Sequence, residues 1–172
     1  MKIKLLIMLV AYFFSCQFAF ADEETGLCQS QEQLIFNCKV GRKFISICAS
    51  KQLMKNSGYM QYRFGEKDRI ELAYPKAHDH PRGRFHLSSI GYGGGGEAHL
   101  RFINEEFEYT VFDSLKKGNQ NADGDRVNIL EAGLVVKKRG KIVSKLLCQD
   151  DASIHAIAYD VLESEEFKSL VP

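Results

Sequence analysis

The sequence lacks an excess of charge of either sign. It carries 23 lysines and arginines against 22 aspartates and glutamates, a formal net charge of +1. Without Lys2 and Lys4 in the first 21 residues, the balance is 21 against 22, a net charge of −1. Such a chain has no general attraction for nucleic acid or acidic lipid. We therefore expect no nucleic-acid partner and recognition through a local surface.

The sequence also lacks a long apolar run beyond residue 21, so we expect no membrane span after that point. Residues 1–21 open with two lysines and close with Ala19-Phe20-Ala21. The apolar run between them is about 16 residues long, whereas a membrane span needs roughly 20. This order predicts a secretory signal peptide over residues 1–21 and a periplasmic or secreted protein. A membrane anchor and a lipoprotein acylated at Cys16 are the alternatives.

Pairs of cysteines spaced as CxxC, which zinc ribbons use, are absent, so we expect no metal and no cofactor. An even number of cysteines in an exported chain predicts disulfides, and four cysteines allow three pairings. If all four pair, at least one bridge joins the N-terminal region to the C-terminal region. The cysteines that follow residue 21 are Cys28, Cys38, Cys48 and Cys148.

Catalytic and nucleotide-binding motifs are absent too. No Ser-His-Asp or Cys-His order stands out, so we expect no catalytic residue and no enzyme activity. The run Gly91–Gly96 lacks G-K-[ST] and precedes a strand pattern, which speaks against a phosphate loop. His78-Asp79-His80 lies in a Pro/Gly-rich loop, which favours surface histidines. Asn119–Gly124 resembles the start of a calcium loop, but Glu131 falls one position late, so a hairpin loop is expected.

Short segments that alternate β-branched or aromatic residues with polar ones fill most of the chain. Residues 22–172 are long enough for a single β-rich domain with one core. The pattern predicts a mainly β fold, an antiparallel sandwich or barrel. The predicted strands are residues 34–40, 43–48, 59–64, 69–74, 85–89, 98–103, 107–112, 128–136 and 141–148.

Two local features refine this fold prediction. A turn at Gly41-Arg42 places position 38 opposite about 45, so direct pairing of Cys38 with Cys48 is awkward. Near the C-terminus apolar residues recur at helical spacing, which predicts one amphipathic helix over about 151–169 that covers an open sheet face. These apolar positions are Ile154, Ile157, Ala158, Val161 and Leu162.

The stretch from Ser57 to Tyr62 reads S-G-Y-M-Q-Y and opens a predicted strand. Gly58 can take a positive backbone angle that suits a sharp loop. Ser57 offers a hydroxyl, and tyrosines combine a rigid apolar body with a polar tip that suits protein contacts. Arg63 follows, with a fork of donors that matches a carboxylate. The alternative is an ordinary turn followed by a strand with packed tyrosines.

The S-G-x-x-Y pattern of Ser57, Gly58 and Tyr62 resembles the loop of bacterial periplasmic and membrane-bound lysozyme inhibitors. The resemblance implies a small, exported, disulfide-bearing antiparallel β protein whose loop enters the lysozyme cleft and meets its catalytic carboxylates. We therefore expect partner-binding residues Ser57, Gly58, Tyr59, Tyr62 and Arg63.

The expected protein partner is a lysozyme or another peptidoglycan hydrolase, and the protein is then a lysozyme inhibitor or an immunity protein against a wall-degrading effector. One alternative is an exported structural or envelope-maintenance protein. Another is a small periplasmic enzyme that uses the histidine loop or an acidic pair.

Overall fold

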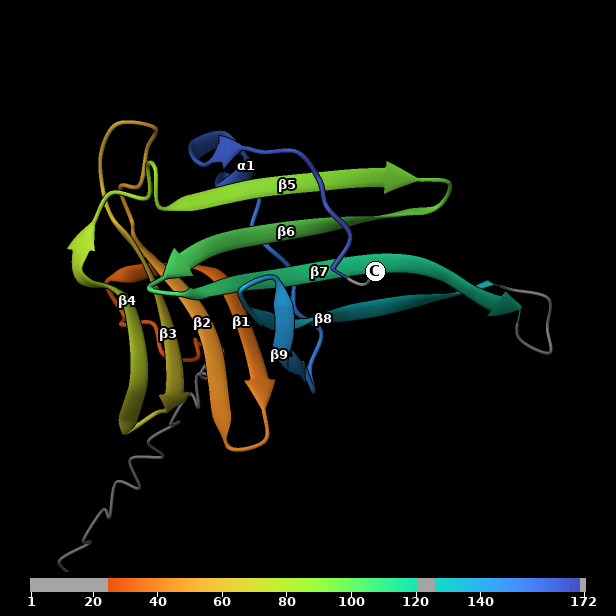
Figure 1. Ribbon diagram of the computed structural model, residues 1–172, viewed down its shortest axis with the longest axis horizontal. Coiled ribbons are helices and arrows are strands. Elements are labelled where there is room, and N and C mark those ends of the chain that lie inside the picture. Colours follow the sequence, from red (N-terminus) through yellow and green to blue (C-terminus); the bar gives the residue numbers. More distant parts are fainter. Residues whose placement is uncertain (1–24, 121–125, 171–172) are drawn as a thin grey trace, which may run out of the picture.

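The computed structural model describes residues 25–120 and 126–170, and their strands form two sheets (Figure 1). The first sheet has four antiparallel strands in the order β1-β2-β3-β4. Short turns join β1 to β2 and β3 to β4, as the predicted hairpins require. The strands are β1 (Glu32–Val40), β2 (Lys43–Ser50), β3 (Met60–Glu66) and β4 (Arg69–Asp79).

The second sheet has six strands in the order β10-β5-β6-β7-β8-β9. All neighbours pair antiparallel except β10, which pairs parallel with β5. Its strands are β5 (Phe85–Tyr92), β6 (Gly95–Asn104), β7 (Phe107–Gln120), β8 (Arg126–Lys138), β9 (Lys141–Leu147) and β10 (Glu163–Ser164). The prediction of a mainly β fold is confirmed. Neither sheet closes on itself within the described residues, so the barrel alternative is not confirmed.

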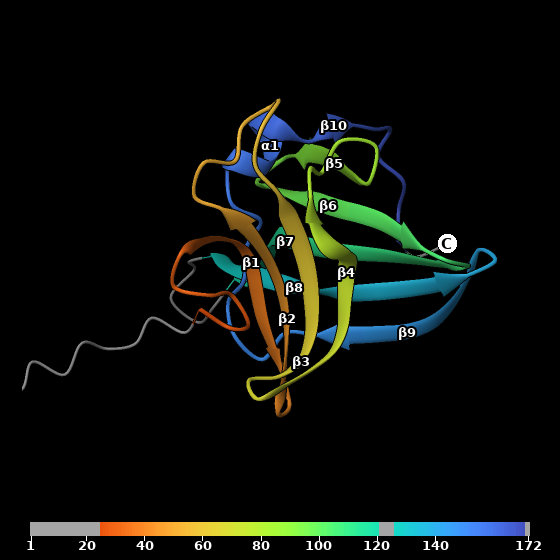
Figure 2. The same cartoon turned by 90° about the vertical axis from the view of Figure 1, so that its left-hand side faces the viewer.

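The two sheets lie against each other and share one core. Figure 2 shows the strands of the first sheet in front of, and running across, those of the second. Tyr62 of the first sheet meets Phe102 of the second, with ring centroids 4.9 Å apart. Phe102 also stacks on Tyr74 at 4.8 Å and on Tyr109 at 4.9 Å. Because full burial of one such side chain contributes about 1.5–3 kcal/mol, this aromatic cluster holds the layers together.

The four cysteines form two disulfides, Cys28–Cys48 and Cys38–Cys148. Cys38 lies opposite Ile45 in the β1–β2 register, as the turn predicts, and so it does not face Cys48. The bridge to Cys148 joins β1 to the chain after β9, which confirms the expected link between N- and C-terminal regions. Disulfides are consistent with an oxidising compartment outside the cytoplasm. The predicted signal peptide and Cys16 lie outside the described residues.

The C-terminal helix is much shorter than predicted. Only α1 (Ile157–Val161) is helical within the predicted span of 151–169. Tertiary partners take the backbone groups that a longer helix needs: Ile154 N–H donates to Asp113 Oδ2 (2.6 Å), and Glu165 N–H donates to the Leu87 carbonyl (2.9 Å). The remaining chain crosses the outer face of the second sheet, where Leu170 packs with Phe112 and Val135.

Two strands continue through segments predicted to be loops. β4 continues through Pro75 to Asp79, beyond the predicted end at residue 74, because β4 is an edge strand where a missing N–H is tolerated. β7 continues to Gln120, beyond the predicted end at residue 112, since Leu115, Lys116 and Lys117 still pair with β8. Among the described residues, no helix has the length and hydropathy that a bilayer crossing requires.

Candidate functional site

The loop between β2 and β3, residues 51–59, projects from one end of the first sheet (Figure 1, upper left). Leu53 anchors it, because this side chain is buried in the shared core. Beyond Leu53 the chain closes a tight turn: Met54 N–H donates to the Ser57 carbonyl (2.9 Å), and Ser57 N–H donates back to Met54 (3.3 Å). Lys55 and Asn56 therefore stand at the tip of a hydrogen-bonded turn.

Gly58 fixes the return of this loop to β3. Its φ is +88°, so the predicted positive angle is confirmed. A Cβ at this position would lie 2.8 Å from the Leu53 Cα and 2.5 Å from the Ser50 Oγ, so no side chain fits. The base is closed by Tyr59, whose N–H donates to Ser50 Oγ (3.2 Å). The conformation of the tip thus follows from a glycine, a buried leucine and a serine.

A second loop, between β4 and β5, braces the first. Arg82 Nη2 donates to the Lys55 carbonyl (3.0 Å) and to Asn56 Oδ1 (2.6 Å). His80 Nε2 lies 3.2 Å from the Met54 carbonyl, and His80 Nδ1 lies 3.2 Å from the Arg82 N–H. We assign Nδ1 as the acceptor, which leaves the ring proton on Nε2 to donate to Met54. We call residues 54–58 together with 80–84 the two-loop surface.

The two-loop surface and its margin carry unbalanced positive charge. Lys51, Lys55 and Arg82 lie beyond ion-pair distance of every described carboxylate. Asp79, the acidic residue beside the second loop, is held by Arg84 at 2.6 Å. Positive charges without a carboxylate partner at an exposed tip favour contact with an anionic group.

Tyr59 connects the projecting loop to the sheet. Its ring stacks on His78 with centroids 3.9 Å apart and planes 3° apart, and its hydroxyl donates to Glu32 Oε1 (2.9 Å). Burial, together with the neighbouring Glu32 carboxylate, raises the pKa of Tyr59, so the hydroxyl stays protonated as a donor. Tyr59 is half-buried and presents only part of its ring to a partner.

Arg63 and Glu32 form a buried ion pair beneath the N-terminal segment. Arg63 Nη1 lies 2.6 Å from Glu32 Oε2 and Nη2 lies 2.7 Å from Oε1, with side chains 3% and 0% exposed. Two further Arg63 donors go to the Leu27 carbonyl (2.9 Å) and Gln61 Oε1 (2.7 Å). Four of the five Arg63 N–H donors are thus used within the fold, and the side chain is buried, so the pair is not presented to a partner protein.

The structure divides the predicted partner-binding residues into two groups. Ser57 and Gly58 are exposed and Tyr59 is half-buried, so their binding role stays a prediction. Tyr62 and Arg63 are 1% and 3% exposed, so neither side chain presents a surface to a partner in this structure, and their binding role also stays a prediction. Strand alternation turns Tyr62 into the core, and the N-terminal segment covers Arg63 on the opposite face.

Sequence reasoning missed the residues that make the tip, which are Met54, Lys55 and Asn56 with their braces His80 and Arg82. The turn chemistry of Lys55-Asn56-Ser57-Gly58 carries a signal for a tight turn, because Asn, Ser and Gly favour such conformations. No comparable sequence signal indicates that the second loop contacts the first.

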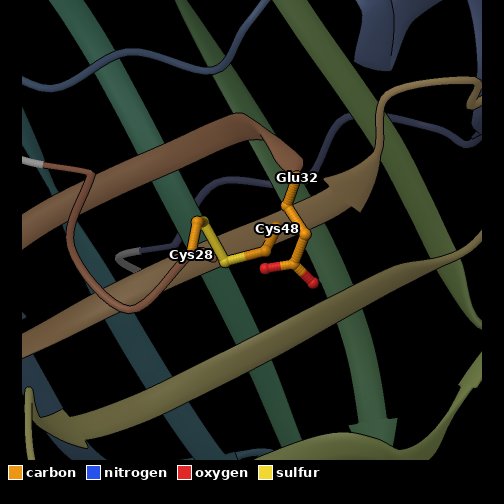
Figure 3. Close-up of side chains that lie close together, drawn as sticks. All are labelled: Cys28, Glu32 and Cys48. Carbon is orange, nitrogen blue, oxygen red and sulfur yellow. A yellow bond between two sulfur atoms is a disulfide. The ribbon is translucent and has the colours of Figure 1, made fainter. Parts of the chain in front are cut away.

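Two clusters among the described residues combine cysteines with one acidic residue, and neither supports metal binding. One cluster is Cys28, Glu32 and Cys48, in which the carboxylate lies beside the disulfide (Figure 3). The other is Cys38, Cys148 and Asp150. In both clusters the sulfurs are bonded to each other, so neither offers a thiolate.

The remaining motifs of the sequence lie elsewhere. The glycine run forms the ends of β5 and β6 and the turn between them, as a hairpin rather than a phosphate loop. His99 is buried on β6, where Nε2 lies 2.7 Å from Glu97 Oε1. Asn119 belongs to β7, and residues 121–124 of the expected hairpin loop lie outside the described residues.

A scan against protein-family models and searches of curated proteins and of solved structures find no match for this chain. The resemblance to lysozyme inhibitors therefore rests on the pattern of Ser57, Gly58 and Tyr62. The first two residues of the pattern lie on the projecting loop, and the third lies in the core beneath it.

The ionisation of Glu32 is expected to make the free energy of unfolding depend on pH in the acid range. Burial raises the pKa of its carboxyl, but hydrogen bonds from Arg63, Gln29 and Tyr59 outweigh burial and leave the pKa below its ordinary value. A carboxyl with a lowered folded-state pKa stabilises the protein above its unfolded-state pKa, about 4.3, and loses that contribution as pH falls through the folded value.

We therefore expect the free energy of unfolding of the wild type to fall more steeply below about pH 4.3 than that of Glu32→Gln, which cannot titrate there. Urea unfolding at a series of pH values measures both slopes. Parallel curves for the two proteins across this range would show that Glu32 does not contribute in this way.

Proposed function

We propose that this protein is an exported binding protein whose two-loop surface occupies an acidic site on a partner protein. The observation that carries this proposal is the projecting turn Met54–Ser57, held by its own hydrogen bonds and by Arg82. Among the described residues, no carboxylate pairs with the Lys55 side chain at its tip. A tip that is rigid before binding loses little conformational entropy on association. Its cations would speed the encounter with an acidic site.

A cell-wall hydrolase is the partner that this chemistry fits best. Enzymes that cleave glycosidic bonds commonly place two carboxylates on either side of a cleft. A narrow convex turn enters such a cleft, and Lys55 at its tip supplies a counter-ion for a catalytic carboxylate. Met54, with 64% of its surface exposed, adds an apolar contact, and Ser57 adds a hydroxyl. Occlusion of the cleft would make the protein a lysozyme inhibitor or an immunity protein.

In this proposal the buried residues of the S-G-x-x-Y region support the projecting loop and do not contact the partner. Arg63 orients Glu32, whose carboxylate accepts a hydrogen bond from the Tyr59 hydroxyl. Tyr59 in turn supports the end of the projecting loop. Tyr62 fixes β3 against the second sheet through its contact with Phe102. This supporting role explains why Tyr62 and Arg63 would follow a recognition loop although neither side chain reaches the partner.

We expect Lys55→Glu to weaken inhibition of the target hydrolase at least tenfold, about 1.4 kcal/mol, because it reverses the charge at the tip. The measurement is a titration of mature protein into a panel of lysozymes and muramidases while wall lysis is followed. Lys141→Glu is the matched control, since Lys141 is an exposed lysine at the start of β9, away from the two-loop surface.

Two results would count against the proposal. One is that the wild type neither binds nor inhibits any member of the panel. The other is that Lys55→Glu and Lys141→Glu inhibit equally well, which would place the contact elsewhere on the protein.

A further inference from the structure

Strand β8 extends well beyond its neighbour β9. The register of β8 with β9 runs from Gly133 to Lys138, and the Ala132 carbonyl accepts the Cys148 N–H (2.9 Å). On one side Arg126, Asn128, Ile129 and Leu130 pair with β7, whose register with β8 shifts between Lys117 and Gln120, beside Val127. On the other side, no described segment hydrogen-bonds to their backbone. Figure 1 shows this part of β8 reaching to the right past β9.

The direction of the free backbone groups follows from Ala132. Its carbonyl points to the β9 side, and the N–H and C=O groups of a strand change side with every residue. Arg126, Asn128 and Leu130 therefore direct their donors and acceptors outward, while Val127 and Ile129 direct theirs to β7. A row of alternating donors and acceptors at this spacing is complementary to another β-strand.

The side chains of residues 127–130 give this edge no charged or proline protection. Val127, Ile129 and Leu130 are 53%, 51% and 56% exposed. Natural proteins commonly guard a free edge with lysines, prolines or bulges. Residues 127–130 read VNIL and contain neither a charge nor a proline, and Arg126 is the one charged side chain of residues 126–130. An apolar edge of this kind favours contact with another strand over contact with water.

We propose that the edge of residues 126–130 pairs antiparallel with the same edge of a second copy of this chain, so that the two six-stranded sheets become continuous. The two copies are related by a twofold axis perpendicular to the sheet, so the same face of each sheet lies on the same side of the dimer. Residues that lie opposite each other must therefore point to the same face. The register that centres on Asn128 meets this requirement. It places Arg126 opposite Leu130 and Val127 opposite Ile129 of the second copy.

This register uses the outward backbone groups at positions 126, 128 and 130 and leaves the Ala132 carbonyl to Cys148. Two Val127–Ile129 pairs form on one face, and the two Asn128 amides meet on the other, where they can exchange hydrogen bonds. Moving the centre to Ile129 would require the Ala132 carbonyl a second time and would set Glu131 against Val127. The register centred on Asn128 is thus the one that pairs residues 126–130 wholly among themselves, which favours a second copy over an unrelated strand.

The contact leaves the two-loop surface free, because that surface lies at the upper left of Figure 1 and the β8 edge at the right. The proposal does not depend on the function proposed above. A short edge contact buries less than the roughly 1,200 Å² of a standard interface, so we expect a weak dimer with dissociation in the micromolar range or above.

Asn128→Pro tests the edge directly. Proline removes an outward N–H that β7 does not use, so the fold is expected to tolerate it while the central pair of the dimer is lost. Asn128→Thr is the matched control, since it keeps the N–H and suits a strand. Sedimentation equilibrium from micromolar to near-millimolar concentration should show a dimer for the wild type and Asn128→Thr and a monomer for Asn128→Pro.

Cysteine substitution reports the register. In the proposed pairing Asn128→Cys faces its own copy at a Cα separation of about 5.5 Å, which suits a disulfide. Arg126→Cys would lie about 13 Å from its copy, four residues along the strand. Rapid intermolecular crosslinking of the first variant, and little of the second, is the expected result. A wild type that stays monomeric throughout, an Asn128→Pro that still dimerises, or equal crosslinking at both positions would overturn the proposal.

Discussion

Glu32→Ala is expected to destabilise the protein by about 3–5 kcal/mol, because it leaves the charge of Arg63 buried without a counter-ion. Arg63 is 3% exposed and has no other carboxylate within ion-pair distance among the described residues. The same change removes the acceptor of the Tyr59 hydroxyl and of the Gln29 N–H. The loss therefore reaches both the N-terminal segment and the base of the projecting loop.

Urea unfolding of the wild type and of Glu32→Ala at neutral pH measures this loss of stability. Glu71→Ala is the control, since Glu71 also pairs with a basic residue, Lys43 at 2.8 Å, but at the surface where solvent screens the pair. Replacing Glu32 and Arg63 together by Leu and Met should recover part of the lost stability, because no uncompensated charge then remains while Tyr59 and Gln29 still lack their acceptor. A cost for Glu32→Ala no larger than that of Glu71→Ala would contradict the buried-pair account.

Removal of the Cys38–Cys148 bridge as a double alanine variant is expected to cost about 5 kcal/mol, against about 3 kcal/mol for Cys28–Cys48. The two bridges span 110 and 20 residues, and the longer loop restricts the unfolded chain more. Cys38–Cys148 also fastens β1 of the first sheet to the chain that leaves the second sheet. Unfolding in urea without reductant compares both variants with the wild type, and the reverse order of losses would contradict this prediction.

Features of the fold with a local cause could be predicted from the sequence. The turn at Gly41-Arg42 sets the register of β1 and β2, and Cys38 accordingly lies opposite Ile45. The positive φ of Gly58 follows from its place at the end of a loop. Hairpins of this kind are determined by neighbouring residues, so alternation and turn chemistry suffice.

Features with a tertiary cause could not be predicted in the same way. The helical spacing of Ile154, Ala158 and Leu162 reflects three buried positions, but contacts with Asp113 and β5 keep the chain on either side of α1 out of the helix. Periodicity records which side chains are buried and does not record which group takes each backbone hydrogen bond.

The candidate site shows the same division. Alternation along β3 places Tyr62 and Arg63 on opposite faces, and this much follows from sequence. That Arg63 is covered depends on Glu32, 31 residues earlier in the chain, and on the N-terminal segment that Cys28 fastens to β2. The brace from Arg82 to Lys55 joins loops 27 residues apart and has no local signature.

Amide hydrogen exchange in the presence of an inhibited wall hydrolase tests the central claim most directly, because it locates the contact on this protein. The expected result is slower exchange at residues 54–58 and 80–84 on binding, with little change along the exposed edge of β8. Unchanged exchange in both loops, with protection confined to another surface, would contradict the account.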